Sequence, residues 1–315
     1  NALVSKPRSG CRMKRESGVN PEQSRCCEVN LFRGALMVKI ITDSASDFEP
    51  NELKELMIDC IPLSVNFGDE EYKDNVTISK DEFFDKLKNT TKTVKTSQPS
   101  LHDIVEEFEV AEHSKDGGVA IFMSSKISGT ANTAQIACDM IGCKNVYVID
   151  SLTASAGQKL LVEYAVKLRR QGKNSKEIYE EIEHIKTKIS LLACLDTLEY
   201  LHNGGRVSQT KAMLATVARI KPVIRLSSGN VELLAKSFNI KRGIKSLAER
   251  LEREELNPHF PVYVMYSDNE SLANDLTSDI KRLLPNVHSV ETVKVGAVIG
   301  SHIGTNACGI AFVKL

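Results

Sequence analysis

Residues 119–141 read VAIFMSSKISGTANTAQIACDMI, and they combine the signals of a buried strand and of a following helix. The unbroken apolar run Val119–Met123 is typical of a buried strand, and Ala131–Ile141 is a helical stretch. Between them, Ser124–Thr130 places hydroxyl groups at the carboxyl end of the strand and at the start of the helix. Free backbone N–H groups and the helix dipole favour an anion there. Ser and Thr are also usual N-cap residues, so the stretch predicts a plain cap, an anion site, or both.

Short apolar runs alternate with helical periodicity from Met37 onward, which predicts an α/β fold. The other runs that read as strands are Val38–Thr42, Ile61–Phe67, Val146–Ile149, Leu191–Leu195, Val223–Leu226, Val231–Leu234, Val262–Tyr266 and Gly309–Val313. Apolar residues at helical spacing begin at Leu101, Ile240 and Leu272. Ser227–Asn230 lies between two apolar runs and predicts a hairpin turn, so the second half of the chain should hold a mixed sheet.

A charged helical segment near residues 174–190 separates two sets of strands and helices. We therefore expect two α/β domains, at residues 37–185 and 186–315. The first should have a mostly parallel sheet flanked by helices, and the second a mixed sheet with helices. Residues 1–36 differ from both, with seven Lys or Arg, three Glu and three Cys but no periodic apolar face. We interpret them as a disordered extension or a vector-derived artefact, because they lack the apolar stretch of a signal peptide.

The chain of 315 residues has 41 basic and 41 acidic side chains, so its formal net charge is zero. This balance does not favour a nucleic-acid-binding protein or one held on an anionic membrane. No apolar run approaches the roughly 20 residues that span a bilayer, so we expect no stable membrane insertion. The eight cysteines are scattered and lack the spacing of a zinc site. They indicate reduced thiols in a cytoplasmic protein, and no metal site is expected.

Three further segments carry residue types that bind ligands. Thr96–Ser100 precedes a helix, and capping of that helix leaves Thr96 and Ser97 unexplained in a loop rich in donors. Arg206 follows a double glycine at the end of a helix, where a guanidinium can approach a ligand closely. His302 lies between two glycines in what reads as a loop after an apolar run. An ordinary loop, a solvated arginine and a structural histidine are the simpler interpretations of these three segments.

Seven short motifs follow one another along residues 37–315. They are Thr-Asp-Ser, Thr-Ser-x-Pro, Ser-Ser-x-x-Ser-Gly-Thr, Asp-Ser, Gly-Gly-Arg-hydrophobic-Ser, Lys-Pro and Gly-x-His-x-Gly. In that order they stand at Thr42–Ser44, Thr96–Pro99, Ser124–Thr130, Asp150–Ser151, Gly204–Ser208, Lys221–Pro222 and Gly300–Gly304. This set and its order resemble the DegV family of bacterial fatty-acid-binding proteins. The chain departs from the family where Thr305–Asn306 replaces Pro-Gly, although Asn tolerates a positive φ better than most residues.

The resemblance implies a long-chain fatty acid, such as palmitate, bound in a buried tunnel between the two domains. It implies a role in lipid transport or fatty acid metabolism, with no catalysis and no cofactor besides the bound acid. The carboxylate-binding hydroxyl groups are implied at Thr96 and Ser128. The supporting ligand site is implied at Ser97, Gly129, Arg206 and His302. A buried carboxylate is costly unless several donors meet it, and these residues supply donors.

The resemblance also implies a partner. Related proteins of Gram-positive bacteria present the fatty acid to a separate kinase, which phosphorylates the carboxylate. A fatty acid kinase subunit is therefore an expected partner. The family's carriers tend to have an arginine near the position of Phe238, so this departure bears on docking to a kinase rather than on ligand binding.

Two other functions fit some of the same residues. A hydrolase acting on a small ester or acyl substrate would use Ser128, His302 and either Asp43 or Asp150 as nucleophile, base and orienting group. The chain has no G-x-S-x-G elbow, so no local motif supports this alternative. A phosphate-bearing ligand would suit the same helix start, but neither a P-loop nor a G-x-G-x-x-G motif is present.

Overall fold

The structure is a computed structural model that describes residues 37–206 and 220–315. Residues 37–315 form one compact unit. The expected extension, residues 1–36, lies outside the described residues, as do Val207 and Ser208 of the fifth motif. The division into domains between residues 185 and 186 stays a prediction.

The first sheet is parallel, as predicted for the first half of the chain. It consists of β1 (Lys39–Asp43), β2 (Ile58–Ile61), β6 (Gly118–Phe122) and β7 (Val146–Asp150), in the order β2-β1-β6-β7. Between β1 and β2 run the 3-10 turn η2 (Ser44–Ser46) and helix α2 (Pro50–Leu56). Strand β6 continues into the hydroxyl-rich loop, and so brings that loop to the carboxyl edge of the sheet.

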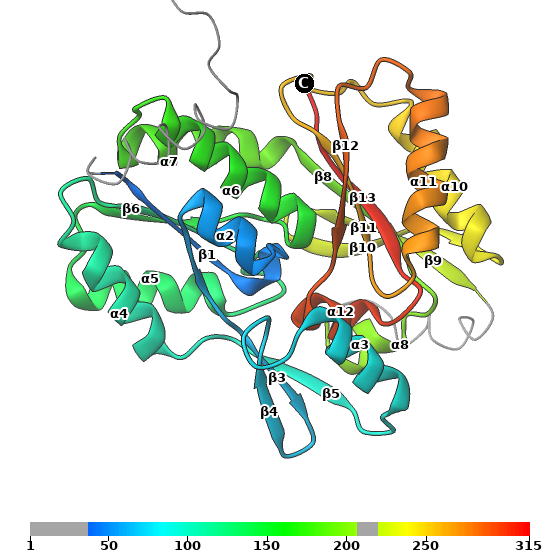
Figure 1. Ribbon diagram of the computed structural model, residues 1–315, viewed down its shortest axis with the longest axis horizontal. Coiled ribbons are helices and arrows are strands. Elements are labelled where there is room, and N and C mark those ends of the chain that lie inside the picture. Colours follow the sequence, from blue (N-terminus) through cyan, green and yellow to red (C-terminus); the bar gives the residue numbers. More distant parts are fainter. Residues whose placement is uncertain (1–36, 207–219) are drawn as a thin grey trace, which may run out of the picture. The chain divides into compact units, whose positions relative to one another are not determined.

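Helices cover both faces of this sheet (Figure 1). One face packs against α4 (Leu101–Glu112) and α5 (Thr130–Ile141), and the other against α6 (Ser155–Arg170) and α7 (Ser175–Ile185). Along β6, Ala120 and Phe122 belong to the core with α4 and α5, whereas Val119 and Ile121 belong to the core with α6 and α7. Because both sides of the strand are buried, its sequence is apolar throughout rather than alternating.

The second sheet has six strands and is mixed, as predicted for the second half of the chain. It consists of β8 (Ile189–Cys194), β9 (Lys221–Ser227), β10 (Asn230–Ser237), β11 (Val262–Tyr266), β12 (Val290–Lys294) and β13 (Cys308–Val313), in the order β10-β9-β8-β13-β11-β12. Only β11 and β12 pair in parallel among these described strands. The predicted hairpin joins β9 to β10, with Ser228 and Gly229 at φ values of 47° and 84°.

The two faces of the second sheet have different neighbours. Helices α10 (Ile240–Leu251) and α11 (Glu270–Leu283) cover one face, where Leu192 and Cys194 of β8 point. Leu191 and Ala193 belong to the other core, which also contains residues of α6 and of the first sheet. Helix α6 packs against strands of both sheets, so one apolar core runs between them. The 3-10 turn η3 (Lys186–Lys188) leads from α7 into β8.

A third, antiparallel sheet was not predicted. It consists of β3 (Ser64–Phe67), β4 (Glu70–Lys73) and β5 (Val94–Ser97), in the order β4-β3-β5, and α3 (Lys80–Asn89) precedes β5. The single strand predicted at Ile61–Phe67 is therefore wrong, because the chain leaves the first sheet at Pro62, which has no backbone N–H to donate to a ladder. Thr96 and Ser97 end β5 rather than lying in a loop, since β5 has too few apolar residues to read as a strand.

The loop predicted around His302 is also wrong. Residues Ala297–Ile303 form helix α12, which the shorter helix α8 (Glu199–Asn203) contacts. Helix α12 ends at Gly304, with φ at 72°, and Asn306 beyond it adopts the positive φ of 54° that its residue type tolerates. A seven-residue helix flanked by glycines carries little local signal, and buried contacts from distant segments stabilise it instead.

Two buried carboxylates hold the start of α12. Asp47 accepts a hydrogen bond from the backbone N–H of Gly296 at 2.7 Å, and Asp74 accepts from the next two N–H groups at 2.9 and 3.4 Å. Asp47 also accepts from the hydroxyl of Ser155, the first residue of α6. Asp47 and Ser155 both have positive φ, at 60° and 53°, and such backbone strain persists only where the surrounding contacts fix it.

Burial of these carboxylates opposes their ionisation. Burial raises the pKa of Asp47 to about 7, despite the nearby Lys80 ammonium and the hydrogen bonds that favour the charged form. Burial likewise raises the pKa of Asp74, and it raises the pKa of Asp43 to about 6. The folded protein therefore holds these protons to higher pH than the unfolded chain does.

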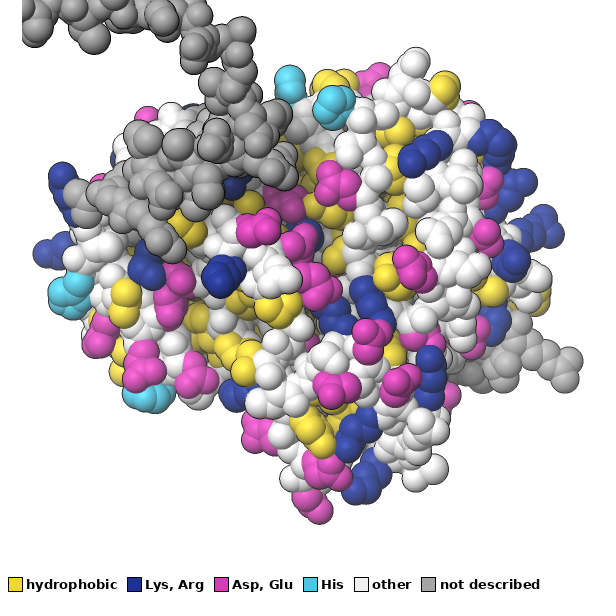
Figure 2. Space-filling view, viewed as in Figure 1, with side chains coloured by type: hydrophobic (Ala, Val, Ile, Leu, Met, Phe, Trp, Pro, Cys, Tyr) yellow, Lys and Arg dark blue, Asp and Glu magenta, His cyan; other side chains and the backbone are white. Residues whose placement is uncertain are grey.

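The face of the molecule in Figure 2 shows basic and acidic side chains interspersed over the described residues, which agrees with the balanced charge of the chain. No helix in the described ranges combines the length and the apolar character that a membrane crossing needs.

The pKa of Asp47 leads to a prediction about Asp47→Asn. Asparagine tolerates positive φ but cannot ionise; its oxygen can accept from the Gly296 N–H, and its amide can donate to the Ser155 hydroxyl in place of the bond that Asp47 accepts. The stabilising effect of a raised carboxyl pKa is full below pH about 4 and is lost as the pH rises through about 7. The free energy of unfolding of the wild type should therefore fall relative to the variant, with a slope approaching about 1.4 kcal/mol per pH unit.

Denaturant unfolding followed by circular dichroism between pH 4 and 7.5 measures this difference. Asp69→Asn removes an exposed carboxyl and serves as the matched control, whose curve should run parallel to that of the wild type. Parallel curves for Asp47→Asn and the wild type would show that the carboxyl ionises without cost in the folded protein.

Candidate functional site

A cavity lies where the three sheets and helices α6 and α12 meet. The space between its lining atoms is about 780 Å³, a volume that includes space open to solvent. Most of its lining is apolar: Leu63, Met123, Ile127, Ala154, Leu191, Ala193, Leu201, Ile224, Leu226, Val231, Met265, Val298, Ile299 and Ile303. The second sheet contributes the face turned away from α10 and α11, because residues two apart on a strand point the same way.

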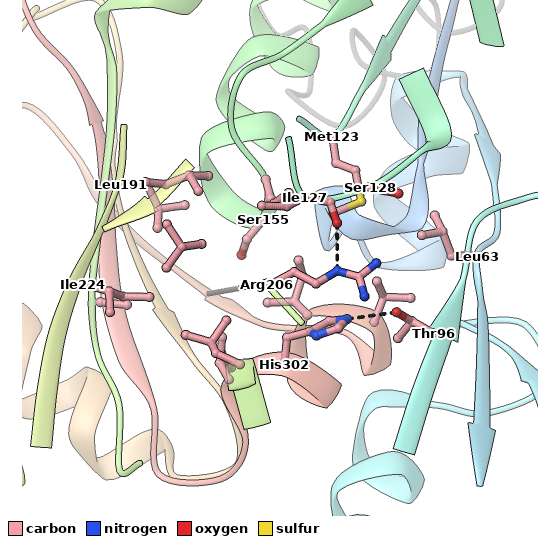
Figure 3. A pocket seen from close by; sticks show the side chains of 18 of the residues that line it. Leu63, Thr96, Met123, Ile127, Ser128, Ser155, Leu191, Arg206, Ile224 and His302 are labelled. Carbon is pink, nitrogen blue, oxygen red and sulfur yellow. Dashed lines mark hydrogen bonds between the residues drawn. The ribbon is translucent and has the colours of Figure 1, made fainter. Parts of the chain in front are cut away.

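Polar side chains gather at one end of this cavity. Thr96, Ser128, Arg206 and His302 lie together in Figure 3, while Leu191 and Ile224 lie at the opposite end. Ser97 and Gln98 also line the cavity and follow directly after Thr96 in the chain. Most of the hydrogen-bonding side chains therefore lie at one end, beside Leu63 and Met123, and the lining around Leu191 and Ile224 is aliphatic.

The loop that carries Ser128 is held from several sides. The hydroxyl of Ser124 donates to the carbonyl of Gly229 at 3.0 Å, which ties the loop to the β9–β10 hairpin. Asp150 accepts from the backbone N–H of Ser125 at 3.1 Å. The hydroxyl of Ser128 lies 2.8 Å from that of Thr130 and accepts from the Thr130 backbone N–H at 3.3 Å. The predicted serine or threonine N-cap is therefore wrong, because the N-cap residue of α5 is Gly129, although the Ser128 hydroxyl binds the first N–H of the helix and also lines the cavity.

Arg206 brings a positive charge to the polar end. Its Nε donates to the carbonyl of Ile127 at 2.9 Å, and one terminal nitrogen donates to the carbonyl of Gly204 at 2.6 Å. Burial lowers the pKa of Arg206, but an arginine remains protonated in such surroundings. Among the described residues, no carboxylate pairs with this guanidinium. A half-buried cation of this kind favours an anion from solution.

His302 connects α12 to β5. Its Nε2 lies 2.9 Å from the hydroxyl of Thr96, and its Nδ1 is buried without a hydrogen-bond partner among the described residues. Burial, together with the charge of Arg206, lowers the pKa of His302 to about 4. The ring approaches Gly204 so closely that a Cβ there would lie 2.2 Å from Nδ1. A neutral imidazole therefore stands at the polar end at physiological pH.

The neutral ring has two tautomers, and we assign the proton to Nε2. In this form Nε2–H donates to the Thr96 oxygen, and the unpartnered Nδ1 is an acceptor. The other tautomer would bury an unpartnered N–H donor, which folded proteins seldom do. With the proton on Nε2, the hydroxyl hydrogen of Thr96 is free to donate to a ligand. His302 then orients Thr96 as a donor.

The predicted site residues thus fall in one place, although their roles in binding stay predictions. Thr96, Ser97, Ser128, Arg206 and His302 all line the cavity. Gly129 is not in the lining but lies beside it, and a Cβ there would be 2.0 Å from the Gln98 side-chain oxygen. Gln98 lines the cavity too but was not among the predicted site residues, although it stands inside the Thr96–Ser100 segment. The aliphatic lining was not predicted either, because the sequence of a strand does not show what its face will contact.

The arrangement needed for a serine hydrolase is not formed. His302 is hydrogen-bonded to Thr96 rather than to Ser128, and its other nitrogen meets neither aspartate. Asp43 accepts from the backbone N–H groups of Ala45 and Met123, and Asp150 accepts from Ser125 and Leu152. Over the two described ranges, no group of His, Cys, Asp and Glu is placed to hold a metal ion. The described residues thus place hydroxyl groups and one guanidinium beside an apolar lining, without the hydrogen bonds of a catalytic triad.

Comparisons with known proteins agree with this geometry. A DegV domain-containing protein of Caldanaerobacter subterraneus subsp. tengcongensis is 30% identical over 276 residues, which cover 87% of this chain and 98% of that protein. The structure of a fatty-acid-binding DegV family protein from Thermus thermophilus matches with a TM-score of 0.79 and 27% identity, covering 89% of this chain and all of that one.

DegV from Bacillus subtilis, described as a fatty acid binding protein, also matches with a TM-score of 0.79, at 26% identity and over the same shares of the two chains. These solved relatives are named for binding a fatty acid rather than for a reaction, in line with the prediction of a binding protein that is not an enzyme. The sequence model of a protein family, described as uncharacterised protein, DegV family, matches residues 37–315. The chain therefore belongs to the DegV family.

Proposed function

We propose that this protein binds a long-chain fatty acid, with the carboxylate at the polar end of the cavity and the acyl chain along its aliphatic lining. The observation that supports this most directly is the half-buried guanidinium of Arg206 beside the hydroxyl groups of Thr96 and Ser128, at one end of an otherwise apolar cavity. Similar structures from Thermus thermophilus and Bacillus subtilis are of proteins described as fatty acid binding.

The headgroup would find donors of three kinds. Thr96 is oriented by His302, Ser128 stands at the start of α5, and Arg206 adds charge. Ser97 follows Thr96 along the same wall, and Gly129 follows Ser128, with the Gln98 amide over it. Charge-assisted hydrogen bonds of this kind compensate a carboxylate for the water it loses.

The acyl chain would gain most of the binding free energy. Each CH₂ group removed from water contributes about 0.8 kcal/mol, so a chain of many carbons outweighs the headgroup contacts. The apolar part of the lining consists of Leu, Ile, Val, Ala and Met side chains. These aliphatic side chains can pack against a flexible acyl chain. A phosphate-bearing ligand without a long apolar part would leave this lining unused.

Presentation of the acyl carboxylate to a fatty acid kinase is part of the same proposal, as is a role in lipid transport or fatty acid metabolism. The polar end of the cavity carries the exposed residues Ser97 and Gln98, so a bound carboxylate would lie near the surface. Purified protein mixed with such a kinase, ATP and palmitate tests this part of the proposal through acyl phosphate formation.

The double variant Thr96→Ala/Ser128→Ala tests the headgroup assignment. Each lost hydrogen bond to a charged group weakens binding by about 1.5–3 kcal/mol, or roughly 10- to 100-fold. Fatty acid recovered by chloroform extraction of the purified protein should therefore drop from stoichiometric to a small fraction, as measured by mass spectrometry. The control Thr187→Ala/Ser278→Ala removes one threonine and one serine hydroxyl outside the cavity and should keep full occupancy. Equal yields from both double variants would contradict the assignment.

Arg206→Met tests the role of charge. The variant should bind palmitate roughly 10-fold more weakly or worse, since a charge-assisted contact is lost, while its affinity for hexadecanol changes little. The two ligands differ only in the headgroup, and titration calorimetry measures both. Arg242→Met, at an exposed position on α10, is the matched control. A loss of the same size for the acid and the alcohol would mean that Arg206 only supports the Ile127 loop.

A further inference from the structure

The exposed residues of the cavity lining lie at its polar end. Of the residues that line it, Ser97 and Gln98 are exposed, while every other lining residue is buried or half-buried. Ser97 is the last residue of β5 and Gln98 follows it, next to Thr96. We therefore infer that the way in from solvent, as far as the described residues form it, passes the Ser97–Gln98 segment.

The side chain of Gln98 reaches across to the other hydroxyl-bearing segment. Its Nε2 donates to the hydroxyl of Thr133, in the first turns of α5, at 2.7 Å. Its Oε1 lies over Gly129, where a Cβ would come within 2.0 Å of that oxygen. The lack of a side chain at Gly129 thus makes room for the Gln98 amide. One hydrogen bond joins the segment of Thr96 to the segment of Ser128 on the solvent side of both.

The backbone on either side of Gln98 is fixed. Ser97 is paired in the third sheet, Pro99 is buried, and Ser100 caps α4 by accepting from the Asp103 N–H at 3.1 Å. The side chain of Gln98 is therefore the part of this segment that is able to move by rotation about its own bonds. Its hydrogen bond to Thr133 is exposed to water, which competes for both partners, so the bond can break and form again without unfolding anything.

We propose that the hydrogen bond between Gln98 and Thr133 is a clasp over the polar mouth of the cavity, and that its opening limits how fast an acid headgroup enters and leaves. The clasp rests on the proposed function, because it presumes an acid ligand in the cavity. It adds a role for two residues outside the headgroup contacts. Thr133 does not line the cavity, so it acts only through Gln98.

A gate and a headgroup contact differ in kinetics. When a gate opens more frequently, the association rate and the dissociation rate of the ligand rise by the same factor, so the dissociation constant stays the same. Loss of a contact to the ligand speeds exit alone and raises the dissociation constant. This difference separates the clasp from a merely supporting role for the same residues.

Thr133→Val removes the hydroxyl with almost no change in shape, and it leaves the cavity lining intact. With cis-parinaric acid as a fluorescent fatty acid, stopped-flow measurements give the association and dissociation rates. Both rates should rise about twofold to tenfold, the range set by loss of one net hydrogen bond, while the dissociation constant changes by less than twofold. Thr133→Ser keeps a hydroxyl and should retain wild-type rates.

Gln98→Ala opens the clasp from its other side and should raise both rates to a similar extent. The double variant Gln98→Ala/Thr133→Val should be no faster than either single variant, because both remove the same bond. Wild-type rates in Thr133→Val, or a rise in dissociation alone, would overturn the clasp while leaving fatty acid binding in place. Absence of cis-parinaric acid binding by the wild-type protein would overturn the proposed function and the clasp with it.

Discussion

An acid headgroup leaves water for an apolar cavity only where fixed donors and a positive charge replace its hydration. In this chain the candidate donors come from segments far apart in sequence: the end of β5, the loop before α5, the turn after α8 and helix α12. Arg206 carries the charge, and it also donates to the Ile127 carbonyl in the loop of Ser128. The polar end therefore depends on contacts that reach from one sheet to another.

The fold provides those contacts through the core between the two larger sheets. Helix α6 packs against both of them, and its first residue, Ser155, is a part of the cavity wall that also binds Asp47. Asp47 and Asp74 in turn hold the start of α12, whose far end presents His302 to Thr96. Buried hydrogen bonds thus fix the start of α12 to Asp47 and Asp74, and a partly buried one joins its far end to Thr96 in the candidate headgroup site.

Strain and burial concentrate along this chain of contacts. Asp47 and Ser155 adopt positive φ although neither is glycine, and the pKa of the Asp47 carboxyl is raised to about 7 by burial. Burial and, to a lesser extent, the charge of Arg206 lower the pKa of His302 to about 4, so its ring is neutral. The positive φ values cost stability at any pH, whereas burial of Asp47 costs stability once its carboxyl ionises and burial of His302 once its ring is protonated. Perturbed pKa values of this kind cluster at functional sites.

The class of fold follows from the sequence, because strands buried on both faces, such as Val119–Met123, are apolar throughout, and amphipathic helices repeat their apolar residues at helical spacing. The candidate polar residues were also predictable, since the hydroxyls, Arg206 and His302 stand in short motifs. Tertiary contacts alone show that Thr96 ends a strand, that His302 lies on a helix, and that Gln98 bonds to Thr133. These features rest on partners more than thirty residues away, such as Thr133 for Gln98, and local periodicity carries no record of a distant partner.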